Sequence, residues 1–289
     1  MKKLFAIILS ILVFTAVLPL SSCKKEEVLE LNVYNWEDYI ACDEEVYDMV
    51  SEFEKWYLEE YGQKVVVNYS TFGTNENMYN ELKLTQKKKG DTVTYSYDLV
   101  CPSEYMIQKM IEEDMLEKLD HSKLPNYNQN VAYYIENLFK TNGWYEYATC
   151  FNWGTMGFTY NPIAVEYDDV KSWQVVSNPK YTNKITIKDS VRDSSVLGLG
   201  YLYRDELMRL KADKESNKLT AKSYNEEVFK YLNDFSANSI ERLRVLLTDV
   251  RKNLYGFEVD SGKQDMATGK LWINFAWSGD AVVYEAFVM

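Results

Sequence analysis

The sequence contains little of the chemistry on which most catalytic and metal sites depend. Its 289 residues include one histidine, His121, and four cysteines. A metal site built on imidazole needs several histidines, and a serine triad needs a histidine beside an activated serine. Cys42, Cys101 and Cys150 lack a CxxC spacing, so they indicate neither a disulfide framework nor a zinc site. We expect Cys101 to be a small buried strand residue and His121 to be a solvated loop residue.

Phosphate-binding loops and an excess of positive charge are also missing. Gly198-Leu199-Gly200 begins like a glycine-rich loop, but Tyr203 stands in place of the third glycine and no Lys-Ser/Thr pair follows. The 32 basic residues are outnumbered by 44 acidic ones, which gives a net charge of −12. Such a surface repels nucleic acid and attracts cations. We expect no nucleic-acid partner and no cofactor.

The N-terminus has the pattern of a removable leader. Two lysines precede an apolar run over residues 5–20, which is shorter than the roughly 20 residues needed to span a bilayer. The run leads into the tetrapeptide LSSC, which resembles a lipobox with Cys23 as the acylated residue. We predict a signal peptide at 1–22, a lipid anchor at Cys23 and a linker at 23–30. The mature protein is then expected outside the cytoplasm, anchored to the cell membrane.

The residues after the leader alternate between strand patterns and helix patterns. Apolar or β-branched runs predict strands at 31–34, 65–67 and 99–101, and helical periodicity follows each run. This alternation predicts an α/β fold whose parallel sheet is wound by right-handed crossovers. The predicted helices begin at Asp43, Asn75 and Pro102 and end near Gly62, Gly90 and Met115, and the second includes the lysines 87–89.

The second half of the chain is less regular in pattern. Residues 123–144 are predicted to form a loop because they combine Pro125 with several asparagines. Residues 147–159 are predicted to be extended, and the charged span 204–253 is predicted to be helical. In open α/β sheets, ligands bind beyond the carboxyl ends of the strands, so we look for a site around the predicted strand ends.

The first of these strand ends carries two rings and two carboxylates between Trp36 and Tyr39. Aromatic faces attract cations by about 0.5–2 kcal/mol each and pack against methylene chains, and carboxylates neutralise ammonium groups. A linear polyamine is a methylene rod with ammonium ends and matches this set. Ser103 at a predicted helix start and Arg192 favour an anion instead, so the residues alone leave both ligand classes open.

Five motifs in order along the chain carry a family resemblance: YNWEDY (34–39), STFGTNENMYNELK (70–83), YDLVCPSEYMIQKM (97–110), IKDSVRD (187–193) and GKLWINFAWSGDA (269–281). Together they resemble the spermidine/putrescine-binding proteins of bacterial ABC transporters. The resemblance implies an α/β, two-lobed, periplasmic-binding-protein-like (type II) fold that binds its ligand in the cleft between lobes.

The resemblance also implies a division of the chain. Lobe 1 is expected at 31–146, and the crossover with lobe 2 at 147–289. Family members continue with a second crossover back to the first lobe, so we expect the fold to be incomplete at the C-terminus.

Nine ligand contacts follow from the resemblance. Asp193 matches an acidic family position, whereas Ser190 stands where spermidine-type members carry an aspartate. Asp280 resembles the putrescine-type branch, so the preferred polyamine stays open. The implied contacts are Trp36, Asp38, Tyr39, Ser103, Tyr105, Ser190, Asp193, Trp277 and Asp280.

The leading hypothesis is a monomeric solute-binding lipoprotein that captures spermidine or putrescine and delivers it to an ABC permease. No bond is made or broken in that role, so we expect no enzyme activity. One alternative keeps the fold and binds an anion or a metal chelate. Another is a secreted hydrolase that uses Asp189 and Asp193 as paired acids.

Overall fold

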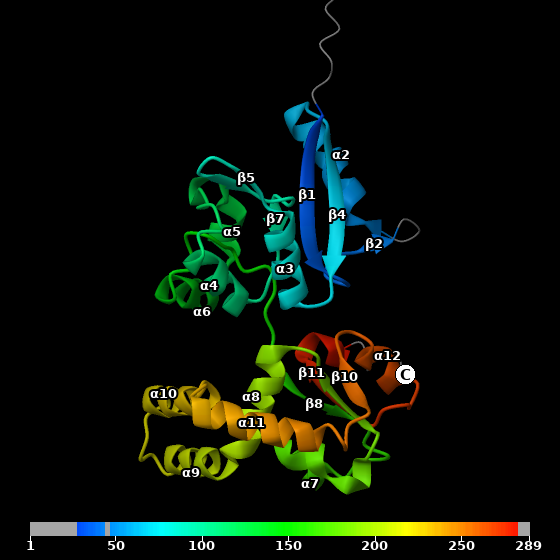
Figure 1. Ribbon diagram of the computed structural model, residues 1–289, viewed down its shortest axis with the longest axis vertical. Coiled ribbons are helices and arrows are strands. Elements are labelled where there is room, and N and C mark those ends of the chain that lie inside the picture. Colours follow the sequence, from blue (N-terminus) through cyan, green and yellow to red (C-terminus); the bar gives the residue numbers. More distant parts are fainter. Residues whose placement is uncertain (1–27, 44–46, 283–289) are drawn as a thin grey trace, which may run out of the picture. The chain divides into compact units, whose positions relative to one another are not determined.

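The computed structural model describes residues 28–43 and 47–282, which form two compact units (Figure 1). Unit 1 contains the described residues up to Thr71 together with Leu82–Val100, and unit 2 contains Phe72–Glu81 together with those from Cys101 onward. Each unit combines helices with a sheet, so the predicted α/β class is confirmed. The predicted signal peptide and Cys23 lie outside the described residues. Within the described residues, no helix has both the length and the apolar character needed to cross a membrane.

A three-stranded sheet forms the centre of unit 1. Strand β1 (Leu29–Trp36) lies between β4 (Val65–Phe72) and β7 (Leu99–Val100), and β1 pairs with β7 in parallel. All three strands were predicted, and β1 and β4 extend further than their apolar runs. β7 ends at Val100, so Cys101 follows the strand and is half-buried, not the buried strand residue that was expected. Backbone pairing continues through polar positions such as Asn35 and Asn68, which composition alone excluded from the predicted strands.

The first helix, α2 (Met49–Tyr61), begins later than the sequence predicted. Its N-cap is Asp48, whose carboxylate accepts a backbone N–H at 3.0 Å, and not Asp43. Asp43 instead ends the short strand β2 (Cys42–Asp43), which pairs with β3 (Tyr47–Asp48). Both aspartates suit a cap, and this small hairpin decides between them because it delays the helix until after Asp48.

The ends of the first two helices differ in how well they were predicted. Gly62 ends α2 in the left-handed region, with φ 66°, as expected of a helix C-terminus. Helix α3 (Asn75–Thr85) starts at the predicted residue but stops before the lysines. These form β5 (Lys87–Lys89), paired with β6 (Thr92–Thr94). In a strand, successive side chains point to opposite faces, which separates three adjacent positive charges better than one helical turn does.

The loop predicted after residue 123 is wrong, because this part of unit 2 is helical. Helix α4 (Glu104–Glu112) is followed by α5 (Pro125–Asn130) and α6 (Tyr133–Thr141). Ile135 and Phe139 are one turn apart on α6 and are buried in a small core with residues of α4 and Trp144. The asparagines occupy exposed positions of these helices. Their number made the segment look like a loop, although its few apolar residues lie on one buried helix face.

His121 is not the solvated loop residue that was expected. It begins a short 3-10 helix, η1 (His121–Lys123), and its ring stacks on Tyr145 with 3.9 Å between ring centroids. Nε2 lies 2.6 Å from the backbone oxygen of Tyr145, so this histidine holds two chain segments together.

The main sheet of unit 2 has the strand order β10-β9-β11-β8. Its strands are β8 (Met156–Tyr160), β9 (Ile185–Lys188), β10 (Gly256–Glu258) and β11 (Ile273–Trp277). β9 pairs in parallel with β10 and β11, whereas β8 and β11 are antiparallel. Of the span predicted to be extended at 147–159, only the end from Met156 is a strand. β9 is buried on both faces, as an interior strand of a covered sheet requires, and it buries the polar residues Thr186 and Lys188 beside its two isoleucines.

Helices pack on this sheet and extend from it (Figure 1). The span predicted to be helical at 204–253 is confirmed as three helices, in which Leu210 and Leu243 are buried. Gly200 lets helix α8 (Val191–Leu202) approach Trp173 closely, since a Cβ at this position would lie 2.4 Å from the indole ring. The helical segments are α7 (Tyr167–Val170), η2 (Trp173–Ser177), η3 (Pro179–Tyr181), α8 (Val191–Leu202), α9 (Arg204–Glu215), α10 (Ala221–Leu232), α11 (Ala237–Val250) and α12 (Gly262–Ala267).

Candidate functional site

In unit 1, the predicted aromatic and acidic cluster lies where β1 ends. The rings of Trp36 and Tyr39 face each other at a tilt, with 6.1 Å between centroids. Trp36 is half-buried, whereas Asp38 and Tyr39 are exposed. Asp38 has a φ of 58°, the left-handed conformation that turns the chain sharply after the strand. The turn therefore leaves two rings and a carboxylate accessible on one short segment.

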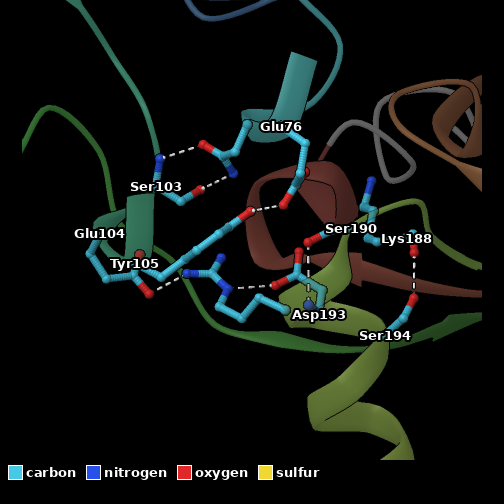
Figure 2. A network of polar contacts seen from close by, with 10 residues as sticks. Glu76, Ser103, Glu104, Tyr105, Lys188, Ser190, Asp193 and Ser194 are labelled. Atoms are coloured by element: carbon cyan, nitrogen blue, oxygen red, sulfur yellow. Dashed lines mark hydrogen bonds and ion pairs between the residues drawn. The ribbon is translucent and has the colours of Figure 1, made fainter. Parts of the chain in front are cut away.

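In unit 2, Ser103 is held by the side chain of Asn75, which was predicted only as a helix start. Asn75, only 3% exposed, accepts the backbone N–H of Ser103 at 2.9 Å and donates its amide to the Ser103 hydroxyl at 3.1 Å (Figure 2). Ser103 occupies the N-cap position of α4 as predicted, but its own side chain makes no capping hydrogen bond. Asn75 thus fixes the backbone N–H and the hydroxyl oxygen of Ser103 at the start of α4.

Tyr105 is the second residue of α4, and its side chain points at Glu76. Its hydroxyl donates a 2.9 Å hydrogen bond to that carboxylate (Figure 2). Burial raises the pKa of Tyr105, and the hydrogen bond and negative charge of Glu76 raise it further. The phenol therefore stays neutral at ordinary pH and acts as a ring with a fixed hydroxyl.

Arg192, at the start of α8, lies over the rings of two implied ligand contacts, Tyr105 and Trp277. The central carbon of its guanidinium is 5.4 Å from the ring centroid of Tyr105 and 5.5 Å from that of Trp277. Its Nε donates to Asp193 at 2.8 Å, and its Nη1 donates to Glu104. Burial by itself lowers the pKa of Arg192, but the Asp193 and Glu104 carboxylates outweigh it and raise the pKa above its ordinary value.

Ser190 and Asp193 belong to one helix start. Ser190 is the N-cap of α8, and its hydroxyl accepts the backbone N–H of Asp193 at 3.2 Å. This bond satisfies one of the unpaired N–H groups of the first turn and fixes the backbone that carries the buried Asp193. The neighbouring Asp189 is exposed, so the two acids of the hydrolase hypothesis have different surroundings.

Asp280 lies in a different polar cluster, around a buried lysine. Lys188 Nζ is 2.9 Å from Glu258 and 3.1 Å from Asp280, and it donates to the backbone oxygen of Val259 at 2.8 Å. The Glu258 oxygen that faces Nζ accepts no well-aligned hydrogen bond, so its contact with Lys188 is a close ion pair. Burial acts to lower the pKa of Lys188, but the two carboxylates outweigh it and raise the pKa.

The predicted site residues of unit 2 therefore separate into two groups. Tyr105, Asp193 and Trp277 surround Arg192, whereas Asp280 pairs with Lys188. Five residues that complete these groups were not predicted as site residues, although four of them lie in the quoted motifs and only Glu258 lies outside them. These residues are Asn75, Glu76, Glu104, Lys188 and Glu258. Among the described residues, no three His, Cys, Asp or Glu side chains form a group that could hold a metal ion.

Comparison with known proteins gives consistent matches. The family described as "Bacterial extracellular solute-binding protein" matches residues 48–287. The spermidine/putrescine-binding periplasmic protein of Salmonella typhimurium is 32% identical over 163 residues. The putrescine-binding periplasmic protein SpuD of Pseudomonas aeruginosa is 30% identical over 266 residues. A solved structure from Listeria monocytogenes, provisionally identified as a spermidine/putrescine ABC transporter, superposes with a TM-score of 0.64 at 26% identity.

These matches cover most of this chain but less of the proteins compared. The aligned region is 56% of this chain and 41% of the Salmonella protein, and 89% and 60% for the Pseudomonas protein. The Listeria structure is matched over 89% of this chain and 65% of its own. The likeness to that structure supports the predicted two-lobed solute-binding fold over nearly the whole chain.

Proposed function

Because the chain belongs to the bacterial extracellular solute-binding protein family, we propose that it captures a polyamine, spermidine or putrescine, and delivers it to an ABC permease. The observation that carries the proposal is the surrounding of Arg192. A cation of the chain itself lies over two aromatic rings and pairs with two carboxylates. The same groups suit an ammonium group on an alkyl chain, and the named relatives support that ligand class.

The two alternatives from the sequence are less well supported. Relatives of this family are transport binding proteins and not enzymes, so the hydrolase hypothesis is abandoned. An anion at Ser103 and Arg192 is disfavoured because the carboxylates of Asp193 and Glu104 already lie against the guanidinium and would repel it. The extracytoplasmic location follows from the family.

The finer parts of the proposal concern the anchor, the lobes and the contacts. We keep Cys23 as the proposed lipid anchor, the lobe boundary at 146/147, and a monomer as the working form. Every ligand contact implied by the resemblance stays a proposal. The charge of Asp280 is already balanced by Lys188, so Asp280 would offer a ligand less negative charge than an unpaired carboxylate.

Isothermal titration calorimetry of the purified protein tests the proposed ligand class. Putrescine or spermidine should give saturable heat, and butane-1,4-diol should give none, because the diol matches the methylene chain of putrescine but has no charge. Equal binding of the diamine and the diol would contradict an ammonium site. If neither putrescine nor spermidine gives heat, the proposed function is wrong.

Replacing Trp36 by alanine is expected to weaken polyamine binding about tenfold, because one aromatic face is worth roughly 1–2 kcal/mol to a partly desolvated cation. Trp56→Ala is the matched control, since Trp56 is a half-exposed tryptophan of the same unit on α2. Titration of both variants checks the prediction. Unchanged affinity in Trp36→Ala would remove this residue from the site.

A further inference from the structure

The aromatic and acidic groups around Arg192 already hold a cation. Three of the nine predicted ligand contacts, Tyr105, Asp193 and Trp277, touch this one guanidinium. Glu104 adds a second carboxylate from the start of α4. These rings and carboxylates can bind either the guanidinium of Arg192 or the ammonium group of a ligand. The two cations would occupy the same position, so they cannot bind there together.

Arg192 differs from Lys188 in how firmly it is held. The side chain of Lys188 is 7% exposed and meets carboxylates that are 3% and 16% exposed. The side chain of Arg192 is 21% exposed, and its partner Glu104 is 43% exposed. Water can therefore reach one of the two ion pairs of Arg192, so its head group can exchange that partner for solvent at low cost. Lys188 and both of its carboxylate partners are too buried for the same exchange with water.

We infer that Arg192 is a tethered cation that occupies an amine subsite in the ligand-free protein and is displaced by the ammonium end of the ligand. This inference rests on the proposed function and adds a specificity-determining residue to it. The subsite takes a compact cation, ammonium or guanidinium, at the end of an alkyl chain. Arg192 leaves by rotating its long side chain toward solvent, while Asp193 stays fixed by the Ser190 cap.

The competition has a defined sign. A binding-competent state that is populated only part of the time lowers the apparent affinity by that fraction. If the arginine occupies the subsite in about nine molecules of ten, its removal should tighten binding about tenfold. An arginine that merely held Asp193 and Glu104 in position would have the opposite effect, because its loss would then weaken binding.

The test compares Arg192→Gln with the wild-type protein by titration with putrescine, spermidine and butane-1,4-diol. We expect Arg192→Gln to bind the amines about tenfold more tightly, with no heat from the diol. Arg244→Gln is the matched control because Arg244 also pairs with a carboxylate, Glu241, but is 66% exposed on α11. Its affinity should equal that of the wild type, which excludes a general effect of net charge.

A second measurement uses the wild-type protein and does not depend on how the variant folds. The Nε–H resonance of Arg192, assigned by its absence from Arg192→Gln or Arg192→Lys, should shift toward that of a solvated arginine as putrescine is added. Amine binding with an unmoved resonance, or an Arg192→Gln variant that binds as the wild type or more weakly, would overturn the inference and leave the proposed function standing. Failure of wild type and variant alike to bind any amine would overturn both.

Discussion

Lys188→Met is expected to lower the free energy of unfolding by about 3–5 kcal/mol, the usual cost of removing one partner from a buried ion pair. Methionine fills much the same volume but leaves Glu258 and Asp280 without a counter-charge. Glu258 is nearly inaccessible to water, and its other oxygen is bonded to the Gly262 N–H at 2.9 Å, so it cannot turn outward. Urea denaturation followed by circular dichroism measures the loss.

Two further variants make this prediction specific. Lys252→Met removes a lysine that is 74% exposed and pairs with Asp249, and it should cost less than about 1 kcal/mol. The triple variant Lys188→Met, Glu258→Gln, Asp280→Asn removes the stranded charges and should recover part of the stability. Equal costs for the two lysines would mean that the cluster around Lys188 contributes no more than a surface pair.

Asp193→Ala should weaken polyamine binding by about 2–5 kcal/mol, which is roughly thirtyfold to several thousandfold. Asp193 is a buried carboxylate in the proposed amine subsite, and its loss leaves a bound ammonium with only the more exposed Glu104. Freeing Arg192 offsets a small part of this loss. Calorimetric titration with putrescine and spermidine measures it.

The neighbouring acid supplies the control for this substitution. Asp189→Ala removes a carboxylate four residues before Asp193 in the chain, but Asp189 is exposed. We expect its affinity to stay near that of the wild type. A large loss in Asp189→Ala would mean that Asp189 substitutes for the aspartate that spermidine-type relatives carry at the position of Ser190, and the site would need to be redrawn around it.

Local sequence patterns predicted the strands of unit 1 well and some helix ends poorly. Runs such as Val65–Val67 carry their own signal, because β-branched residues favour a pleated, buried strand. The N-cap of α2 depends on the pairing of two short strands, β2 and β3, and no local pattern around Asp43 or Asp48 predicts that pairing. Helices α5 and α6 were missed because their exposed asparagines outweighed two buried residues in the composition.

The ion pairs of unit 2 could not be predicted from local patterns. Lys188, Glu258 and Asp280 come from a strand, a neighbouring strand and the segment after a third strand, so only the sheet order brings them together. Arg192 illustrates a different limit. Its position in a motif was known, but the direction in which its side chain points depends on Glu104 and Tyr105, which lie far away in the sequence.

The place of Arg192 over the two rings also has a kinetic consequence. A side chain tethered beside its subsite returns at a high effective concentration whenever the ligand's ammonium lets go, because linking a competitor to the site turns its rebinding into an intramolecular step. Recapture of the loosened amine is then blocked, and the remaining contacts must hold it alone. A residue that lowers affinity in this way shortens the residence time of the cargo, which suits the proposed delivery of the cargo to a permease.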